Sequence, residues 1–361
     1  MTLPSTERYD TIVVGAGPAG IMAAMHAAER GTVLVIDASS LPRDKSCGGM
    51  LHDLSIEALA PYGEVPESIV ASPRHVHFRY VDWDRGIRKP TTLPFLNVDR
   101  AGFDDWLVSL LPETVEVVGS SALVGFRQDA AGVEVDCKTA DGVVTLQCAN
   151  LVGADGARSA VRRGLGVGAT STYVTLQDFV TLDGEIEPYF DCIYARQLGD
   201  SFGYGYIVPK NGHALVGSVF YPKTKRPWEK ADRLLEIMRA AMPQLGESVK
   251  REACAALYLR ANSDVVPGVG RVLLAGEAGG FMSPSSGEGI SYALRSGIEA
   301  GRAIAGHSAS EALGAYTGAV ATMRSDTARR LRWLPLMESR VGKYVAGFVP
   351  TAIVSRVTQG L

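Results

Sequence analysis

The sequence lacks the features that place a protein in a membrane or in an oxidising compartment. No apolar stretch approaches the roughly 18 residues that a membrane-spanning helix requires. The first residues, MTLPSTERYDTIVVG, have no basic region followed by a long apolar run, so no secretory signal is expected. The five cysteines are odd in number, widely spaced and without a CxxC pair, which argues against a disulfide framework or a zinc site. We therefore expect a protein of the reducing cytoplasm.

The charge balance excludes a further class of protein. A formal net charge of -3 and a pI near 6.1 give no reason to expect nucleic-acid binding. His75 and His77 share one face of an expected strand, but without a third ligand nearby they indicate no metal site. A length of 361 residues is enough for one large unit or for two domains that share an interface. The unusual feature is glycine, with 40 residues, and the placement of these glycines is informative.

The segment YDTIVVGAGPAGIMAAMHAAERGTVLVIDAS, from Tyr9 to Ser39, contains the clearest of these placements. An apolar strand precedes the pattern GxGxxG and a helix follows it. Gly15 allows the tight turn, Gly17 lets the backbone approach a pyrophosphate, and Gly20 allows close packing of helix on strand. Asp37 follows 22 residues after Gly15 and ends the second strand, where a carboxylate can hold a ribose hydroxyl. This context predicts a dinucleotide-binding βαβ unit, but it does not distinguish NAD from FAD.

Two later segments decide between these cofactors. They are LVGADGARSAVRR, from Leu151 to Arg163, and LLAGEAGGFMSPSSGEGI, from Leu273 to Ile290. Together with the N-terminal segment, they resemble the three nucleotide motifs of the FAD-dependent monooxygenase superfamily. The sequences CGGM, GYGYIVPK and PSSGEGI are similar to those of its geranylgeranyl-reductase-like branch. The resemblance extends from about Tyr9 to Gly301 and implies FAD as the cofactor.

The resemblance implies an α/β fold. A Rossmann-like FAD-binding domain of three-layer ββα architecture is expected to be interleaved with an antiparallel β-sheet substrate domain and followed by C-terminal helices. The FAD-binding domain is expected in three segments, residues 1–72, 99–170 and 262–305. The substrate domain is expected in two segments, residues 73–98 and 171–261, and the C-terminal helical segment in residues 306–361.

The resemblance also implies a set of residues around FAD. They are Gly15, Gly17, Ala19, Gly20, Asp37, Arg43, Cys47, Gly48, Gly49, Arg100, Asp155, Gly156, Gly276, Glu277, Pro284, Gly287, Gly289 and Ile290. Glu277 departs from the family pattern, in which an aspartate one methylene shorter binds the ribityl chain. From Pro284 to Ile290, backbone N–H groups at a helix start are expected to face the N1–C2=O edge of the flavin.

Three residues are candidates for a place beside the flavin and the substrate. Cys47 has no second cysteine five positions on, where His52 stands, so a redox disulfide is excluded. A packing role and a covalent link to the flavin both stay open for Cys47. Tyr204 and Tyr206 alternate with glycines and should face one side of a strand, either toward substrate or in sheet packing.

The expected chemistry is that of an FAD-dependent oxidoreductase. The leading expectation is a monooxygenase that hydroxylates or epoxidises a compact organic substrate with reduced FAD and O₂. Reduction of a carbon–carbon double bond in an isoprenoid or other alkene is the alternative, and modification of a partner protein is a third possibility. No second complete fingerprint occurs, so we expect NAD(P)H to bind transiently or a partner flavin reductase to supply electrons.

The C-terminal run from Ala321 onward carries seven Arg or Lys residues against two acidic ones, together with many apolar residues. This composition allows peripheral contact with a membrane surface, capping of a channel for an apolar small-molecule substrate, or simple packing of an amphipathic helix on the main body. Pro335 and Pro350 are expected to divide the run into short helices.

Overall fold

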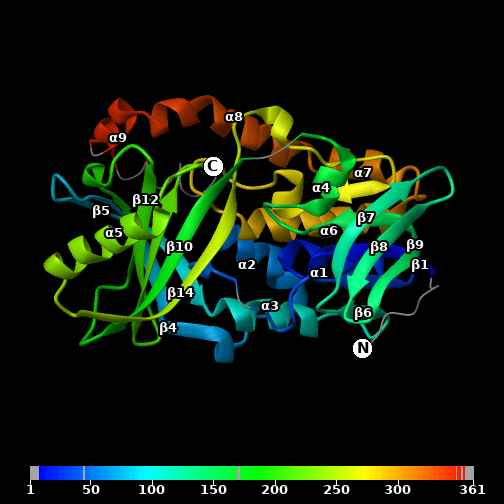
Figure 1. Ribbon diagram of the computed structural model, residues 1–361, viewed down its shortest axis with the longest axis horizontal. Helices are drawn as coiled ribbons and strands as arrows, with labels where there is room; N and C mark the ends of the chain where they lie inside the picture. The colour runs from blue at the N-terminus through cyan, green and yellow to red at the C-terminus, as the bar shows by residue number, and fades with distance from the viewer. Residues whose placement is uncertain (1–7, 44, 169–170, 347, 351–352, 354–361) are drawn as a thin grey trace.

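The chain forms two β-sheets with their covering helices, followed by the two C-terminal helices α8 (Ala321–Glu338) and α9 (Arg340–Ala346) (Figure 1). The computed structural model describes residues 8–43, 45–168, 171–346, 348–350 and 353. Within these residues no helix is long and apolar enough to cross a lipid bilayer.

The first sheet has the strand order β15–β16–β9–β1–β2–β6, and β8 and β7 continue it from β9 as an antiparallel extension. Its strands are β1 (Arg8–Val14), β2 (Val33–Ile36), β6 (Val115–Val118), β7 (Ala122–Gln128), β8 (Val133–Thr139), β9 (Gly142–Gly153), β15 (Gly268–Val269) and β16 (Val272–Leu274). The central strands β6, β2, β1, β9 and β16 are parallel. Their short, almost uninterrupted apolar runs are typical of strands that are buried on both faces.

Different layers cover the two faces of this sheet. One face packs against the helices α1 (Pro18–Ala27), α3 (Arg100–Ser109), α6 (Ile290–Gly306) and α7 (Ala312–Ala319). The other face packs against β7, β8 and the short helix α4 (Ala160–Leu165). This is the expected three-layer ββα arrangement. Helix α6 approaches α1 closely at Gly297, because this residue has no side chain. Any side chain there would overlap the carbonyl oxygen of Ala19.

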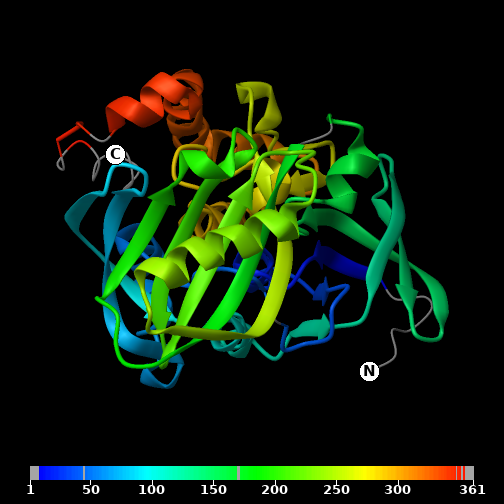
Figure 2. The same cartoon turned by 60° about the vertical axis from the view of Figure 1, so that its left-hand side comes forward.

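The second sheet has the order β14–β10–β13–β12–β11–β4–β5–β3, in which only the pair β11 and β4 is parallel. Its strands are β3 (Met50–Leu51), β4 (Val70–Asp82), β5 (Ile87–Val98), β10 (Ser171–Leu182), β11 (Tyr189–Tyr194), β12 (Phe202–Lys210), β13 (His213–Phe220) and β14 (Leu245–Tyr258). Helix α5 (Pro227–Ala241) lies across one face of this sheet (Figure 2). The opposite face carries a cluster rich in aromatic side chains, among them Phe78, Phe95, Phe190 and Tyr206.

Short helical elements connect these parts. They are α2 (Asp53–Leu59) and the 3₁₀ turns η1 (Ala60–Tyr62), η2 (Glu67–Ile69), η3 (Arg196–Leu198), η4 (Asn262–Asp264) and η5 (Gly276–Gly279).

The chain continues after α7 into α8 (Ala321–Glu338) and α9 (Arg340–Ala346). The expectation that Pro335 would end a helix was wrong, because α8 contains Pro335 and continues to Glu338. The proline removes one N–H donor near the end of the helix, and the N–H of Ser339 closes the last turn on the carbonyl groups of Pro335 and Leu336. The expectation for Pro350 concerns a segment that lies largely outside the described residues.

Candidate active site

The glycine turn between β1 and α1 has the geometry of a phosphate-binding turn. Gly15 has φ +106°, and a side chain at Gly15 or Gly20 would overlap neighbouring backbone atoms. Gly17 is the N-cap of α1, where no side chain caps the helix and no acidic residue occupies the first turn. The helix start therefore offers N–H groups and the positive end of its dipole to a phosphate.

Asp37 ties the second strand to this turn. Its Oδ2 accepts a hydrogen bond from the N–H of Ala16 at 2.8 Å. The guanidinium of Arg43 lies beside it, with Nη1 3.9 Å from Asp37 Oδ2 and Nη2 3.1 Å from Asp104 Oδ2. Arg43 Nε is buried, and within the described residues it has no hydrogen-bond partner. A cation next to an uncapped helix start fits the pyrophosphate of a dinucleotide.

Other residues expected near the cofactor lie at the ends of neighbouring elements. A side chain at Gly276, which has φ +58°, would come within 3.0 Å of Ala19 Cβ, so the turn after β16 rests on α1. Asp155 accepts hydrogen bonds from the hydroxyl of Ser159 at 2.5 Å and from the N–H of Ala160 at 2.6 Å, and thus caps α4. Gly156 follows it with φ +74°.

Glu277 uses its longer side chain to reach the second sheet. Its Oε1 accepts a hydrogen bond from the N–H of Leu257 in β14 at 3.2 Å, and its Oε2 lies 3.9 Å from Lys45 Nζ. The carboxylate also faces Gly156, where an added Cβ would lie 3.9 Å from Oε2. Glu277 therefore lies where the two sheets meet, and its contact with the ribityl chain stays a prediction.

The CGG loop, Cys47 to Gly49, is held tightly against the start of α3. Gly49 has φ +68°, and a side chain there would overlap the carbonyl oxygen of Val98 and come within 2.8 Å of Lys210 Nζ. The carbonyl oxygen of Gly49 accepts the N–H of Val98 at 2.9 Å. At Gly48 a side chain would meet Phe190 at an ordinary 3.6 Å, so the packing of this protein does not by itself require that glycine.

Cys47 lies in an electropositive part of this loop. Burial by itself raises the pKa of its thiol, but Arg100, the N–H of Gly49 and Lys45 together lower the pKa below the ordinary value of 9.0. Arg100 is buried at the start of α3 and pairs with Asp104 at 2.8 Å. The thiol is therefore poised to release its proton more easily than an ordinary cysteine.

Lys210 is a second titratable group beside the same loop. It ends β12, is buried, and donates a hydrogen bond from Nζ to the carbonyl oxygen of Val98 at 2.5 Å. Burial lowers the pKa of its ammonium to about 8, a change that the neighbouring Cys47 opposes and Arg100 supports. Cys47 and Lys210 thus place two proton-bearing groups around Gly49.

Tyr204 and Tyr206 both belong to the aromatic cluster opposite α5, so they face the same side of β12, as expected. The hydroxyl of Tyr206 donates to Gln177 Oε1 at 2.8 Å, and its ring stacks on Phe190 with centroids 5.4 Å apart. The hydroxyl of Tyr204 reaches the PSSGEGI loop, where a Cβ at Gly287 would lie 2.8 Å from it. Tyr204 therefore reaches the boundary with the loop before α6, whereas Tyr206 packs on Gln177 and Phe190 of the second sheet itself.

The loop before α6 places Pro284 in a turn, Gly289 at the N-cap and Ile290 at the first helical position. Glu288 from the same loop accepts hydrogen bonds from the N–H of Ser291 at 2.7 Å and from its hydroxyl at 2.8 Å. The N–H group of Ser291 at the helix start is thus bonded to Glu288. The prediction that N–H groups face the flavin can therefore apply only to the other N–H groups of this helix start.

Glu288 is also linked to the N-cap of α2, which follows the CGG loop and β3. His52 Nε2 lies 3.5 Å from Glu288 Oε2, and His52 Nδ1 accepts the N–H of Leu54 as the N-cap of α2. Burial raises the pKa of the Glu288 carboxyl, but His52 and Ser291 outweigh it and lower the pKa below 4.5. This pair joins the loop that precedes α6 to the start of α2.

Four of these residues were not predicted from the sequence. Lys210 and Glu288 lie within the motifs GYGYIVPK and PSSGEGI, and a charged residue inside an apolar or glycine-rich motif was an available signal. His52 and Gln177 gave no such signal, because only the fold brings them to the boundary between the sheets.

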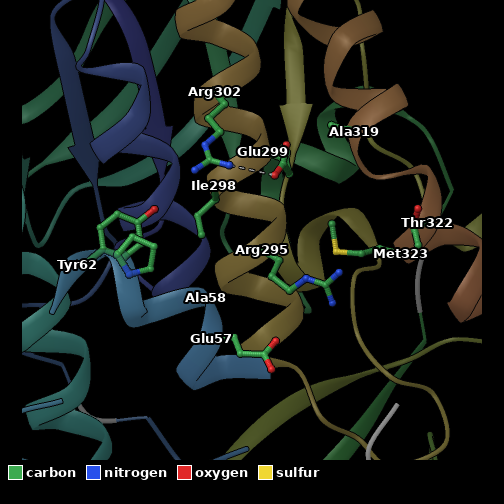
Figure 3. Close-up of a pocket in the computed structure, with 11 residues that line it drawn as sticks. Glu57, Ala58, Tyr62, Arg295, Ile298, Glu299, Arg302, Ala319, Thr322 and Met323 are labelled. Atoms are coloured by element: carbon green, nitrogen blue, oxygen red, sulfur yellow. Dashed lines mark ion pairs between the residues drawn. The ribbon is translucent and has the colours of Figure 1, made fainter. Parts of the chain in front are cut away.

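A separate surface pocket of about 250 Å³ lies between α2, α6 and the start of α8 (Figure 3). Charged side chains gather around it, including Glu57, Arg295, Glu299 and Arg302. None of the residues expected to hold FAD lines this pocket, so it is distinct from the candidate active site.

Comparison with known proteins gives a family that agrees with this geometry. The FAD binding domain family matches residues 8–331. Protein CbrA of Escherichia coli O9:H4 is 30% identical over 296 residues, which is 80% of each chain. The fold resembles a geranylgeranyl bacteriochlorophyll reductase-like protein from Thermoplasma acidophilum, with TM-score 0.79, 18% identity and 98% and 92% of the two chains covered. It also resembles the flavin-dependent brominase Bmp2, with TM-score 0.77, 18% identity and 98% and 94% covered. The chain belongs to the FAD binding domain family and is an FAD-dependent oxidoreductase.

Proposed function

We propose that the protein reduces a carbon–carbon double bond of a small organic substrate, with NAD(P)H as the source of electrons. Such a reduction adds a hydride to one alkene carbon and a proton to the other, while NAD(P)H is oxidised to NAD(P)⁺. FAD, when bound in its reduced form, supplies the hydride. The protein must then supply the proton, and the observation that supports this chemistry is the placement of Cys47 and Lys210 around Gly49.

A general acid works best when its pKa lies near the operating pH. Arg100, the N–H of Gly49 and Lys45 lower the pKa of the Cys47 thiol below its ordinary value, and burial lowers the pKa of Lys210 to about 8. We assign the proton transfer to Cys47. The cationic groups of Arg100 and Lys210 would stabilise the thiolate that remains, and Lys210 is able to return a proton to it.

The aromatic face of the second sheet suits an apolar substrate. Phe95, Phe190 and Tyr206 form part of one buried cluster on the side opposite α5. These side chains would exclude water from the reacting carbons, and the Tyr204 hydroxyl would orient the substrate against the PSSGEGI loop. The similarity in fold to a protein described as geranylgeranyl bacteriochlorophyll reductase-like supports an alkene substrate.

Oxygenation of a compact substrate with O₂ is the second candidate function. The same water-excluding aromatic cluster would protect an oxygen-transfer reaction. We place it second because a cysteine with a lowered pKa is readily oxidised, and an enzyme that handles activated oxygen would expose Cys47 to that damage.

Anaerobic turnover separates the two candidates. The FAD-loaded protein is incubated with NAD(P)H and a panel of isoprenoid and smaller alkenes in the absence of O₂, in H₂O and in D₂O. We expect a saturated product, with one solvent deuterium incorporated in D₂O. No anaerobic product, together with an aerobic product that contains oxygen from labelled O₂, would overturn the proposal in favour of the oxygenase.

A substitution of Cys47 can be compared with the same substitution at Cys254. Cys254 is a partly buried cysteine nearby, and its Sγ donates to the carbonyl oxygen of Ser46 at 3.4 Å. We expect Cys47→Ser to slow alkene reduction and to shift its pH profile, while Cys254→Ser leaves both unchanged. Equal effects of the two substitutions would show that Cys47 is not the proton donor.

A further inference from the structure

The outward face of α8 has an unusual composition. Its buried positions recur at helical spacing and pack on the body of the protein: Met323, Thr327, Arg330 and Leu334. The opposite face would ordinarily be polar. Instead it carries two apolar side chains, Trp333 and Leu336, which are 62% and 53% exposed, beside Arg329 and Arg332. Positions 329, 332, 333 and 336 are three or four residues apart and so lie on one side of the helix.

The same character continues through α9. Three more large apolar side chains are exposed in α9, Val341, Tyr344 and Val345, and Phe348 is exposed just after it. Of the thirteen large hydrophobic residues exposed in the described part of the chain, seven fall between Trp333 and Ile353. Exposed apolar residues are ordinary when single, but a cluster of this kind marks a surface that binds something.

Hydrogen bonds to backbone carbonyl groups and to the Glu338 side chain fix this region to the second sheet. Arg85 Nη2 donates to the carbonyl oxygen of Tyr344 at 2.8 Å, and Lys89 Nζ donates to that of Val349 at 2.7 Å. The hydroxyl of Tyr258 in β14 donates to Glu338 Oε2 at 3.0 Å. These contacts hold α8 and α9 at the outer edge of the molecule (Figures 1 and 2). The large apolar side chains of this region are exposed.

We propose that this face docks on a lipid bilayer that contains anionic headgroups. The docking face consists of Arg329, Arg332, Trp333, Leu336, Val341, Tyr344, Val345 and Phe348. The chain as a whole has a net charge of -3, whereas the docking face itself carries Arg332 and Arg329, of which Arg329 also pairs with Asp326 at 2.6 Å. A basic, apolar surface on an acidic protein matches anionic lipid, because basic residues bind the headgroups while apolar and aromatic side chains enter the interface.

The first test measures binding of the full-length, FAD-loaded protein to vesicles by flotation. Vesicles contain either phosphatidylcholine alone or phosphatidylcholine with phosphatidylglycerol. We expect binding to the anionic vesicles, weaker binding at high salt, and little binding to neutral vesicles. Absence of binding to anionic vesicles at low salt would overturn the proposal.

Two pairs of substitutions test the docking face, each with a matched control. Trp333→Ser with Leu336→Ser should weaken vesicle binding at least tenfold, whereas Val124→Ser with Val143→Ser removes two valines exposed to a similar degree elsewhere and should have no effect. For charge, Arg329→Gln with Arg332→Gln should weaken binding to anionic vesicles. Arg226→Gln with Arg233→Gln, on α5 and its N-cap, should not.

The fluorescence of Trp333 gives a readout independent of activity. Addition of anionic vesicles should shift the tryptophan emission to the blue in the wild type but not in Trp333→Phe. Retained flavin absorbance and an unchanged melting temperature establish that the variants are folded. Loss of self-association in the Trp333→Ser, Leu336→Ser variant, with vesicle binding unaffected, would assign the face to a second copy of the chain and overturn the proposal.

Discussion

His52 Nε2 lies 3.5 Å from Glu288 Oε2 and thereby joins the N-cap of α2, which follows the CGG loop and β3, to the loop that precedes α6. Because His52 Nδ1 accepts a backbone N–H, Nε2 is the ring nitrogen that directs a proton at the carboxylate. The loop that precedes α6 is thus held to the start of α2 by a buried pair.

This pair should give a measurable coupling energy. We expect His52→Gln and Glu288→Gln each to destabilise the protein and to weaken FAD binding. The double variant should lose less than the sum of the two, with a coupling of about 1 kcal/mol. Denaturant unfolding of the four proteins, with FAD titrated by fluorescence, measures it. Strictly additive effects would show that the two side chains do not interact.

Gly49 permits a second comparison, because the chain contains a glycine with almost the same backbone conformation in open space. Gly49 has φ +68° and is crowded by Val98 and Lys210, whereas Gly86 has φ +65° and no atom within 4 Å of an added Cβ. Gly86→Ala should therefore lower the free energy of unfolding only through the strain of a left-handed backbone, on the order of 1 kcal/mol.

Alanine at Gly49 carries the same strain and a steric overlap in addition. We expect Gly49→Ala to be destabilised by about 1–3 kcal/mol more than Gly86→Ala. Thermal unfolding of both variants checks this difference. Equal melting temperatures would show that the CGG loop can move away from β5.

The fold was accessible from the sequence because its signals are local. The GxGxxG pattern needs only a strand, a turn and a helix in succession, and Gly15 and Gly20 have the crowded positions that their motif requires. The site was accessible only in part. Lys210 and Glu288 become significant through burial and through partners far along the chain, which no local pattern shows.

The same reasoning explains the error at Pro335. Proline was expected to break the helix, but the loss of one hydrogen bond near the end of α8 is small compared with the packing of Met323, Thr327 and Leu334. Tertiary packing decided an element boundary that local preference predicted incorrectly.

Glu277 leads to a prediction about side-chain length. Glu277→Gln keeps an acceptor for the N–H of Leu257, so we expect its stability to stay within about 0.5 kcal/mol of the wild type. Glu277→Asp is too short to reach Leu257 and leaves that N–H without its partner, which should cost about 1–2 kcal/mol. Thermal unfolding without FAD ranks the two. The reverse order would mean that the negative charge near Lys45, and not the reach of the side chain, matters at this position.

Lys210 should make stability depend on pH in a defined direction. Its pKa is about 8 in the folded protein, against an ordinary value of 10.5 for the unfolded chain. Between these two values the unfolded chain binds more protons, so the free energy of unfolding rises as pH increases. The stability that Lys210 contributes in its uncharged form is therefore fully present above pH 10.5 and is lost as pH falls through about 8, where the buried amine becomes charged. Its upper limit is about 3 kcal/mol.

The prediction is tested by comparing the wild type with Lys210→Met, since the difference between the two curves removes the titration of other groups. From pH 7 to pH 10, the free energy of unfolding of the wild type should rise relative to Lys210→Met. Lys138→Met, at an exposed position of β8, serves as the control for replacing a lysine by methionine as such. If Lys210→Met ran parallel to the wild type, the ammonium would have the same proton affinity in both states. Lys210 would then be a packing residue, unable to return a proton to Cys47 near neutral pH.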